Sequence, residues 1–221
     1  MSADSSSPTR KCRAVVLISG SGSNLQTFLD AAANAECEYA VEAVISNKAD
    51  AYGLTRAQNA GVATEVLSHK GFADRDSFDQ AMVELIDSYE PDLVILAGFM
   101  RILTPDFVRH YSGRLLNIHP SLLPKYQGLH THKRALEAGD DEHGATVHFV
   151  TEELDGGPSI LQAAVPIEAG DTPEVLAQRV LVQEHKIYPQ VAQWFAQGRL
   201  RMIGDRAEFD GELLPRSGLR L

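Results

Sequence analysis

An asparagine and a histidine lie two residues apart at the end of a short apolar run, in the stretch LLNIHP over residues 115–120. Side chains alternate across a β-strand, so Asn117 and His119 share one side while Ile118 points to the other. Pro120 disfavours a helical backbone at His119 and ends the hydrogen-bond ladder. We therefore expect both polar groups at the carboxyl end of a strand, where open α/β sheets bind ligands.

The chemistry of this pair suits the activation of a carbonyl group. An asparagine amide can donate hydrogen bonds to a carbonyl oxygen, and a histidine can give or take a proton near neutral pH. The alternative is a buried asparagine and histidine whose polar atoms are satisfied by backbone groups. The two residue types alone leave both interpretations open.

A glycine-rich stretch, SGSGSN over residues 19–24, follows an apolar run and precedes a helical pattern. Glycines allow close approach of a ligand, and the free N–H groups of a helix start favour a phosphate or carboxylate. No Lys-Ser/Thr pair follows, so the stretch is not a nucleotide P-loop, and Leu25 stands where a dinucleotide fingerprint needs its third glycine. The alternative is a tight turn in which Ser23 or Asn24 caps the helix.

Two further carboxylates are candidates. Asp155 lies in LDGGP, where an acidic residue commonly bonds its own turn backbone; facing His119 instead, it would stabilise the charged imidazole. Glu184 lies within an apolar helical stripe, so it needs a partner, a cleft edge or a path to water. That stripe consists of Leu176, Val180, Ile187, Val191 and Trp194.

Composition limits the class of protein. The 221 residues are 44% hydrophobic and carry a net charge of −10, which argues against binding nucleic-acid phosphates as the main task. Cys12 and Cys37 form no C-x-x-C motif and no disulfide framework, so we expect the cytoplasm. No apolar run is long enough for a membrane span, and the start lacks the apolar core of a signal peptide.

Apolar runs alternate with helical patterns along the chain. We predict strands over 13–18, 40–46, 92–97, 115–119, 145–150 and 160–167. Helices are predicted up to about residue 33, over 51–60 and 74–90, and from about residue 173. The alternation predicts an α/β, doubly wound, mostly parallel twisted sheet with an antiparallel part toward the C-terminus. We expect a flexible polar tail over 1–11 and one domain over 12–221.

Five stretches together resemble the phosphoribosylglycinamide branch of the folate-dependent formyltransferases, in order and in spacing. They are SGSGSN, LAGFMRIL at 96–103, LLNIHPSLLP at 115–124, HFVTEELDGGP at 148–158 and QEH at 183–185. The resemblance runs from about residue 13 to the low 200s. It implies the formyltransferase fold, with a Rossmann-like N-terminal half, and transfer of a formyl group from 10-formyltetrahydrofolate to the amine of phosphoribosylglycinamide.

The resemblance also implies roles for individual residues. Asn117 would bind the formyl oxygen, His119 would act as general acid, and Asp155 would pair with His119 and assist proton removal from the amine. The ribonucleotide would contact Gly22, Ser23, Asn24 and Glu184. The folate would contact Arg75, Met100, Arg101, Ile102, Leu103, Asn117, Thr151, Glu152, Glu153, Leu154 and Asp155. Arg101 could equally be an ordinary surface charge.

Other assignments complete the expectations. No metal and no nicotinamide are expected, and His130 and His132 lack a third ligand at a recognisable spacing. His148 is interpreted as a satisfied core histidine, with a supporting role at the site as the alternative. Gln127 stands where many relatives have proline, which puts the rigidity of the loop 121–132 in question. The partners would be small molecules, without nucleic acid or membrane, and the chain would be a monomer or homodimer.

Three other functions share part of this pattern. A methionyl-tRNA formyltransferase or a formyltetrahydrofolate deformylase would share Asn117, His119 and Asp155. The excess of acidic over basic residues and the lack of a basic C-terminal domain count against the methionyl-tRNA enzyme. The lack of an N-terminal regulatory domain counts against the deformylase. A nucleotide- or folate-binding protein without catalysis would not need the complete Asn-His-Asp set.

Overall fold

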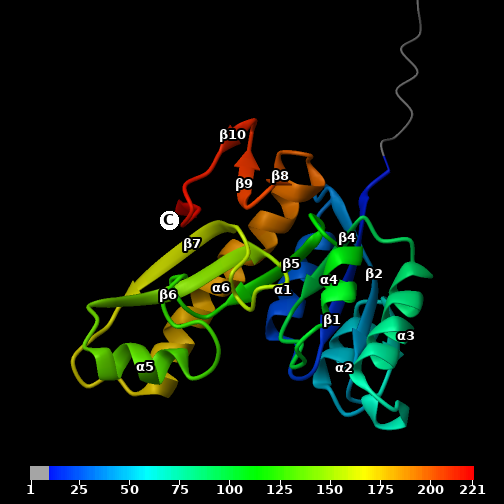
Figure 1. Ribbon diagram of the computed structural model, residues 1–221, viewed down its shortest axis with the longest axis horizontal. Helices are drawn as coiled ribbons and strands as arrows, with labels where there is room; N and C mark the ends of the chain where they lie inside the picture. Colours follow the sequence, from blue (N-terminus) through cyan, green and yellow to red (C-terminus); the bar gives the residue numbers. More distant parts are fainter. Residues whose placement is uncertain (1–9) are drawn as a thin grey trace, which may run out of the picture.

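The computed structural model describes residues 10–221, and residues 1–9 of the expected tail lie outside the described part (Figure 1). An eight-stranded sheet has the order β11-β7-β6-β5-β4-β1-β2-β3. Its strands are β1 (Cys12–Ile18), β2 (Tyr39–Ser46), β3 (Ala63–Val66), β4 (Leu93–Leu96), β5 (Leu115–His119), β6 (Glu142–Phe149), β7 (Ser159–Pro166) and β11 (Leu219–Arg220). From β3 to β5 neighbouring strands are parallel, whereas β6 is antiparallel to both β5 and β7. The predicted sheet, with its antiparallel part toward the C-terminus, is confirmed.

Helices cover both faces of the sheet, which explains why its central strands are apolar on both sides. Along β1, Val16 and Ile18 pack into a core with α1 (Ser23–Ala32), α2 (Tyr52–Asn59) and α6 (Pro173–Ala196). Val15 and Leu17 point the other way, into a core with α3 (Arg75–Asp87) and α4 (Pro105–His110). The period-two alternation therefore divides one buried strand between two hydrophobic layers.

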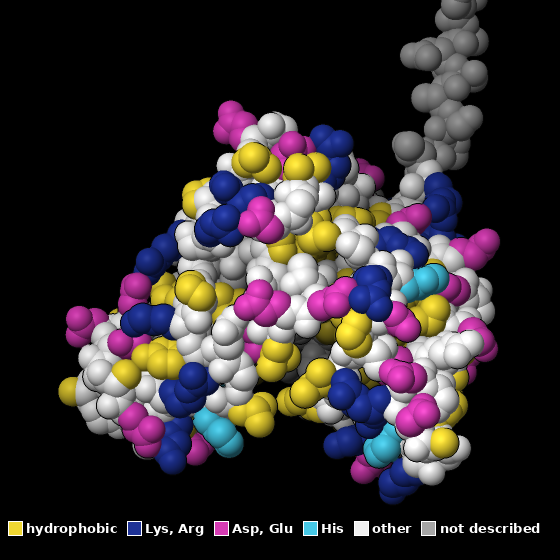
Figure 2. Space-filling model, viewed as in Figure 1, with side chains coloured by type: hydrophobic (Ala, Val, Ile, Leu, Met, Phe, Trp, Pro, Cys, Tyr) yellow, Lys and Arg dark blue, Asp and Glu magenta, His cyan; other side chains and the backbone are white. Residues whose placement is uncertain are grey.

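The sheet topology creates a ligand-binding edge. From the central pair β1 and β4, the order of the parallel strands continues to β2 and β3 on one side and to β5 on the other. Loops that leave the carboxyl ends of β1 and β4 therefore diverge, and open α/β sheets bind ligands in the crevice between such loops. In the view of Figure 2 the surface is hollowed near the bottom. The hollow lies between the part that holds α5, β6 and β7 and the part that holds α2 and α3, and hydrophobic side chains lie on both of its rims.

Several short elements were not predicted. They are β3, a 3₁₀ turn (His69–Gly71), α4, α5 (Thr131–Ala138), β11 and a second sheet of β8 (Leu200–Ile203), β9 (Arg206–Phe209) and β10 (Glu212–Leu213). Most are short and half-exposed, so they carry little hydrophobic periodicity. Tertiary contacts hold them instead: Trp194 at the end of α6 packs on Phe209 of β9, with ring centroids 4.5 Å apart. Among the described residues, no helix has the length and apolar character needed to cross a membrane.

Candidate active site

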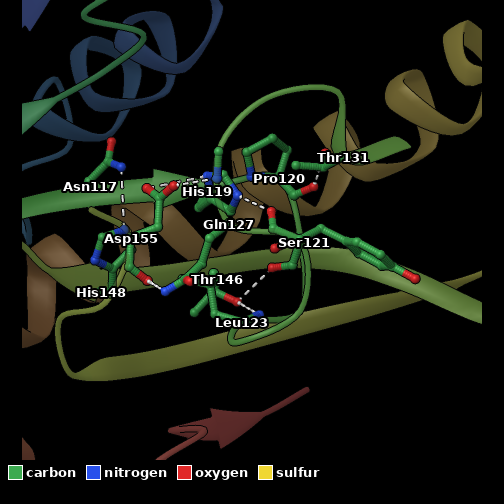
Figure 3. Close-up of polar contacts among 12 residues, drawn as sticks. Asn117, His119, Pro120, Ser121, Leu123, Gln127, Thr131, Thr146, His148 and Asp155 are labelled. Atoms are coloured by element: carbon green, nitrogen blue, oxygen red, sulfur yellow. Dashed lines mark hydrogen bonds and ion pairs between the residues drawn. The ribbon is translucent and has the colours of Figure 1, made fainter. Parts of the chain in front are cut away.

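The predicted end of β5 is confirmed, and it places two polar side chains together. β5 ends at His119, directly before Pro120, and the side chains of Asn117 and His119 lie on the same side of the strand (Figure 3). Asn117 is half-buried, whereas His119 is only 6% exposed. Polar side chains buried to this extent need hydrogen-bond partners, which the neighbouring strand β6 supplies to Asn117 and the loops around β5 supply to His119.

Both ring nitrogens of His119 face hydrogen-bond acceptors. Nε2 lies 2.8 Å from the backbone oxygen of Tyr126, and Nδ1 lies 3.5 Å from a carboxylate oxygen of Asp155. Because a carbonyl oxygen can only accept, Nε2 carries a proton. A second proton on Nδ1 gives the imidazolium, which is attracted to the carboxylate. The 3.5 Å separation is long for a charge-assisted hydrogen bond, so the Nδ1–H group can also serve another acceptor.

Asp155 reaches the histidine across the chain rather than bonding its own turn. It lies between β6 and β7 with a positive φ of 51°, and its side chain is 9% exposed. Its second carboxylate oxygen accepts the backbone N–H of Gly128 at 2.9 Å. Gly157 permits the close return of the chain, because a Cβ there would lie 1.9 Å from the oxygen of Phe149. The alternative of a purely local turn residue is therefore wrong.

Asn117 is oriented by His148, its cross-strand neighbour on β6. Nδ1 of His148 donates to the Phe149 oxygen at 2.9 Å, which leaves Nε2 as an acceptor for the Asn117 amide at 3.3 Å. Burial lowers the pKa of His148, so the ring is held in this neutral form. The second N–H of the Asn117 amide remains available to a ligand. His148 is thus buried and satisfied as predicted, but one of its partners is a site residue.

The glycine stretch forms the turn between β1 and α1. Gly22 has a φ of +72° and approaches α2 so closely that a Cβ would lie 2.7 Å from the Cα of Gly53. Gly22 is itself the N-cap of α1, so Ser23 and Asn24 stand inside the first turn and do not cap it. The tight turn of that alternative is present, but its capping by Ser23 or Asn24 is wrong. The first N–H groups of an α-helix have no partner within the helix, so the start of α1, after the carboxyl end of β1, is a favourable position for an anion.

Asn24 and Glu184 meet, although they come from α1 and α6. The Asn24 amide donates to the Glu184 carboxylate at 2.8 Å, and Glu184 is 8% exposed. Burial raises the pKa of Glu184, and the Asn24 hydrogen bond opposes that shift. Among the described atoms the Asn24 side-chain oxygen is buried without a partner. Glu184 therefore has a partner and does not reach for water, and Asn24 retains an acceptor for a ligand.

The loop after β4 lies beside the glycine turn. The Met100 N–H donates to the Ser19 hydroxyl at 2.8 Å, which ties the two loops together. Met100 and Ile102 expose 72% and 64% of their surface, so the loop presents apolar side chains to solvent. The Arg75 guanidinium donates to the Ile102 oxygen at 2.7 Å.

Arg101 and Leu103 are less exposed members of the same loop. The Arg101 guanidinium lies 4.6 Å from the ring centroid of Phe78, and its Nε is buried without a partner among the described atoms. Arg101 is therefore not a freely solvated surface charge.

The loop after β6 carries the other residues assigned to the folate. Thr151 is half-buried and Glu153 is exposed, while Leu154 exposes 57% of its surface. Glu152 forms an ion pair with Arg109 of α4 at 2.8 Å. Asp155 of this loop turns its side chain toward His119 of β5, as Figure 3 shows.

Comparison with known proteins adds independent information. The sequence profile of the formyl transferase family matches residues 12–192. The chain is 60% identical to the phosphoribosylglycinamide formyltransferase of Escherichia coli over 204 residues, which are 92% of this chain and 96% of that protein. It is 46% identical to the human trifunctional purine biosynthetic protein adenosine-3 over 193 residues, 87% of this chain but 19% of that protein.

A solved structure is also similar. The phosphoribosylglycinamide formyltransferase of Coxiella burnetii superposes with a TM-score of 0.91 at 51% identity, over 96% of this chain and 99% of that one. The similarity therefore extends over both the parallel and the antiparallel parts of the sheet.

Proposed function

The chain belongs to the formyl transferase family, and from that membership we infer that it transfers the formyl group of 10-formyltetrahydrofolate to the amine of 5'-phosphoribosylglycinamide. The product is the N-formyl ribonucleotide of de novo purine biosynthesis. The observation that carries the proposal is the convergence of Asn117, His119 and Asp155 from β5 and a distant loop. These three groups supply a neutral donor, an acid and a carboxylate around one point, which formyl transfer to an amine requires.

The reaction begins when the amine nitrogen attacks the formyl carbon. Charge then develops on the formyl oxygen, where the free N–H of Asn117 and the Nδ1–H of His119 can donate to it. Asp155, beside Nδ1, stabilises the imidazolium and accepts the proton that the amine loses, directly or through water. The carbon–N10 bond of the folate then breaks, and N10 takes up the proton that the amine released, passed on from Asp155 directly or through water. Each such donor or acid contributes on the order of 10²–10⁴ in rate.

The substrates would occupy the two sides of this centre. The phosphate of the ribonucleotide would bind the N–H groups of Gly22, Ser23 and Asn24, where a helix start favours an anion. Glu184 and the free oxygen of Asn24 would accept hydrogen bonds from the same substrate.

The folate would lie between two loops, those of residues 100–103 and 151–155. Their exposed Met100, Ile102 and Leu154 offer apolar contact to an aromatic ring. Arg75, at the start of α3, would meet the glutamate tail, because its guanidinium is exposed and uses one donor on Ile102.

The remaining assignments belong to the same proposal. The chain acts in the cytoplasm, as one domain over 12–221, on small molecules and without nucleic acid, membrane, metal or nicotinamide. The net charge of −10 is unfavourable for binding nucleic-acid phosphates, which supports the assignment of no nucleic-acid partner. It would be a monomer or a homodimer.

The test is a rate assay with phosphoribosylglycinamide and 10-formyltetrahydrofolate, each also supplied alone. We expect tetrahydrofolate and the N-formyl ribonucleotide to appear in equal amounts, and only when both substrates are present. Release of tetrahydrofolate at an equal rate without the ribonucleotide would identify a deformylase instead. Binding of both substrates without any turnover would identify a binding protein.

A further inference from the structure

Three consecutive residues of the loop after β5 hold both the histidine and the aspartate of the site. The Tyr126 oxygen accepts from Nε2 of His119 at 2.8 Å, and the Gly128 N–H donates to the Asp155 carboxylate at 2.9 Å. Between them, the Gln127 side-chain amide donates to the Asp155 backbone oxygen at 3.3 Å (Figure 3). We call these three residues the clamp. Its position fixes how the imidazole and the carboxylate face one another.

The clamp does not hold its own shape. Tyr126 has a φ of 55° and Gly128 a φ of 80°, so two of the three backbones are left-handed. This conformation is strained for the tyrosine, and such residues persist where their surroundings fix them. Contacts from outside the clamp are therefore needed to keep it in place.

Arg134 of α5 supplies such contacts. Its Nη1 donates to the backbone oxygen of Gln127 at 2.7 Å and to that of Leu129 at 3.2 Å. Its guanidinium also lies over the ring of Tyr126, 5.2 Å from the centroid. One planar group thus bridges two backbone oxygens and covers the aromatic side chain of the clamp. A lysine ammonium could reproduce only part of this arrangement, because it can donate to both oxygens from one nitrogen but has no flat face to lie over the ring.

The opposite edge of the clamp is fixed separately. The Tyr126 hydroxyl donates to the Asp140 carboxylate at 2.6 Å, and Lys125 pairs with the same carboxylate at 3.0 Å. This edge remains anchored when Arg134 is removed. Removal of Arg134 should therefore loosen the clamp rather than unfold the loop.

We propose that Arg134 is a positioning residue for formyl transfer, acting on His119 and Asp155 through the clamp. The part of this inference that concerns rate rests on the proposed function. The part that concerns the clamp rests on geometry alone. Arg134 should therefore affect the chemical step more than the binding of either substrate, because the clamp contacts the catalytic pair and not the glycine turn or the loop 100–103.

The test compares Arg134→Ala with Lys133→Ala in the full chain. Lys133 is the neighbouring exposed cation on α5 and pairs with Glu137 at 3.6 Å, so it is a matched control. We expect Arg134→Ala to lower kcat about 3- to 10-fold, the loss of one or two charge-assisted hydrogen bonds at an exposed position, with both KM values within about twofold. Arg134→Lys should recover part of the loss, and Lys133→Ala should leave kcat unchanged.

Amide hydrogen exchange at Gly128 provides the second measurement. This N–H group donates to Asp155, so loosening the clamp should accelerate its exchange in Arg134→Ala and not in Lys133→Ala. Equal kcat for the two alanine variants, or a loss of kcat without faster exchange at Gly128, would overturn the inference. If the wild type failed to turn over the two substrates, the proposed function would be refuted. Faster exchange in Arg134→Ala would still support the role of Arg134 in the clamp, and unchanged exchange would refute it.

Discussion

Replacing Asp155 separates the catalytic role of its carboxylate from its structural role. In Asp155→Asn the amide oxygen can keep the Gly128 hydrogen bond, and the NH₂ group then faces Nδ1 of His119. An NH₂ group donates, so Nδ1 must become an acceptor while Nε2–H keeps its bond to Tyr126. His119 would then be neutral, and the proton assigned to the formyl oxygen would be missing.

The size of the effect follows from these contacts. Loss of the acid should lower kcat on the order of 10²- to 10⁴-fold, or about 3–5 kcal/mol in the activation barrier. The melting temperature of Asp155→Asn should stay close to that of the wild type. Asp155→Ala should lose kcat similarly and also leave the half-buried Gly128 N–H without its protein partner. That costs about 1 kcal/mol, which lowers the melting temperature by about 2–4 °C in a chain of this size.

The assay is steady-state kinetics with both substrates, together with thermal melting. Asp141→Asn serves as the control, because Asp141 is an exposed acid in the loop before β6 and outside the site. We expect its kcat to equal that of the wild type. If Asp155→Asn retained kcat within about threefold of the wild type while folding normally, the carboxylate would not be supporting the acid, and the proposed role of His119 as an imidazolium donor would be wrong.

Three further changes test other parts of the site and its surroundings. Burial raises the pKa of Glu184, so the folded chain binds a proton at Glu184 more readily than the unfolded chain does, and it loses stability as the pH rises through the range in which glutamate titrates. The melting temperature of Glu184→Gln should therefore be above that of the wild type at pH 7 but not at pH 4, and the KM of the variant for the ribonucleotide should rise. Gly22→Ala should lower the free energy of unfolding by about 1–3 kcal/mol in denaturant titrations, since its Cβ would meet Gly53 and its φ is positive. Burial lowers the pKa of His143 to about 4, so stability should fall as pH drops from about 6.5 toward 4, and melting curves of His143→Gln should show a smaller fall.

The sequence predicted the elements that are long and periodic. β1, β4 and β5 carry runs of buried apolar residues, and α3 and α6 show helical spacing over several turns. These elements fix the class of fold, because alternating strands and helices form a parallel sheet with two covered faces. The second sheet, β8 to β10, was missed because its half-exposed strands depend on contacts such as Trp194 against Phe209.

The candidate site was predictable where its residues are close in sequence. Asn117 and His119 share a side because side chains alternate along a strand, and Pro120 fixes where that strand ends. The partners of these two residues were not predictable from local pattern. His148 meets Asn117 through the β5–β6 register.

The same limit applies to the clamp. Tyr126 and Gly128 act through backbone groups, which every residue type possesses. No residue pattern identifies them, and the arginine that holds them lies on a helix that the sequence did not predict.

By itself, then, the sequence determined the strand end that presents Asn117 and His119, the glycine turn at Gly22 and the α/β class. Each of these depends on local backbone preference or on the period of the apolar residues. The family resemblance implied that Asp155 pairs with His119, and the structure shows the two side chains facing each other. Only the tertiary structure decided that Asn24 shares a buried hydrogen bond with Glu184 and that Arg134 reaches the clamp. These contacts join residues on different elements, and their distances are set by how the elements pack, which local preference does not encode.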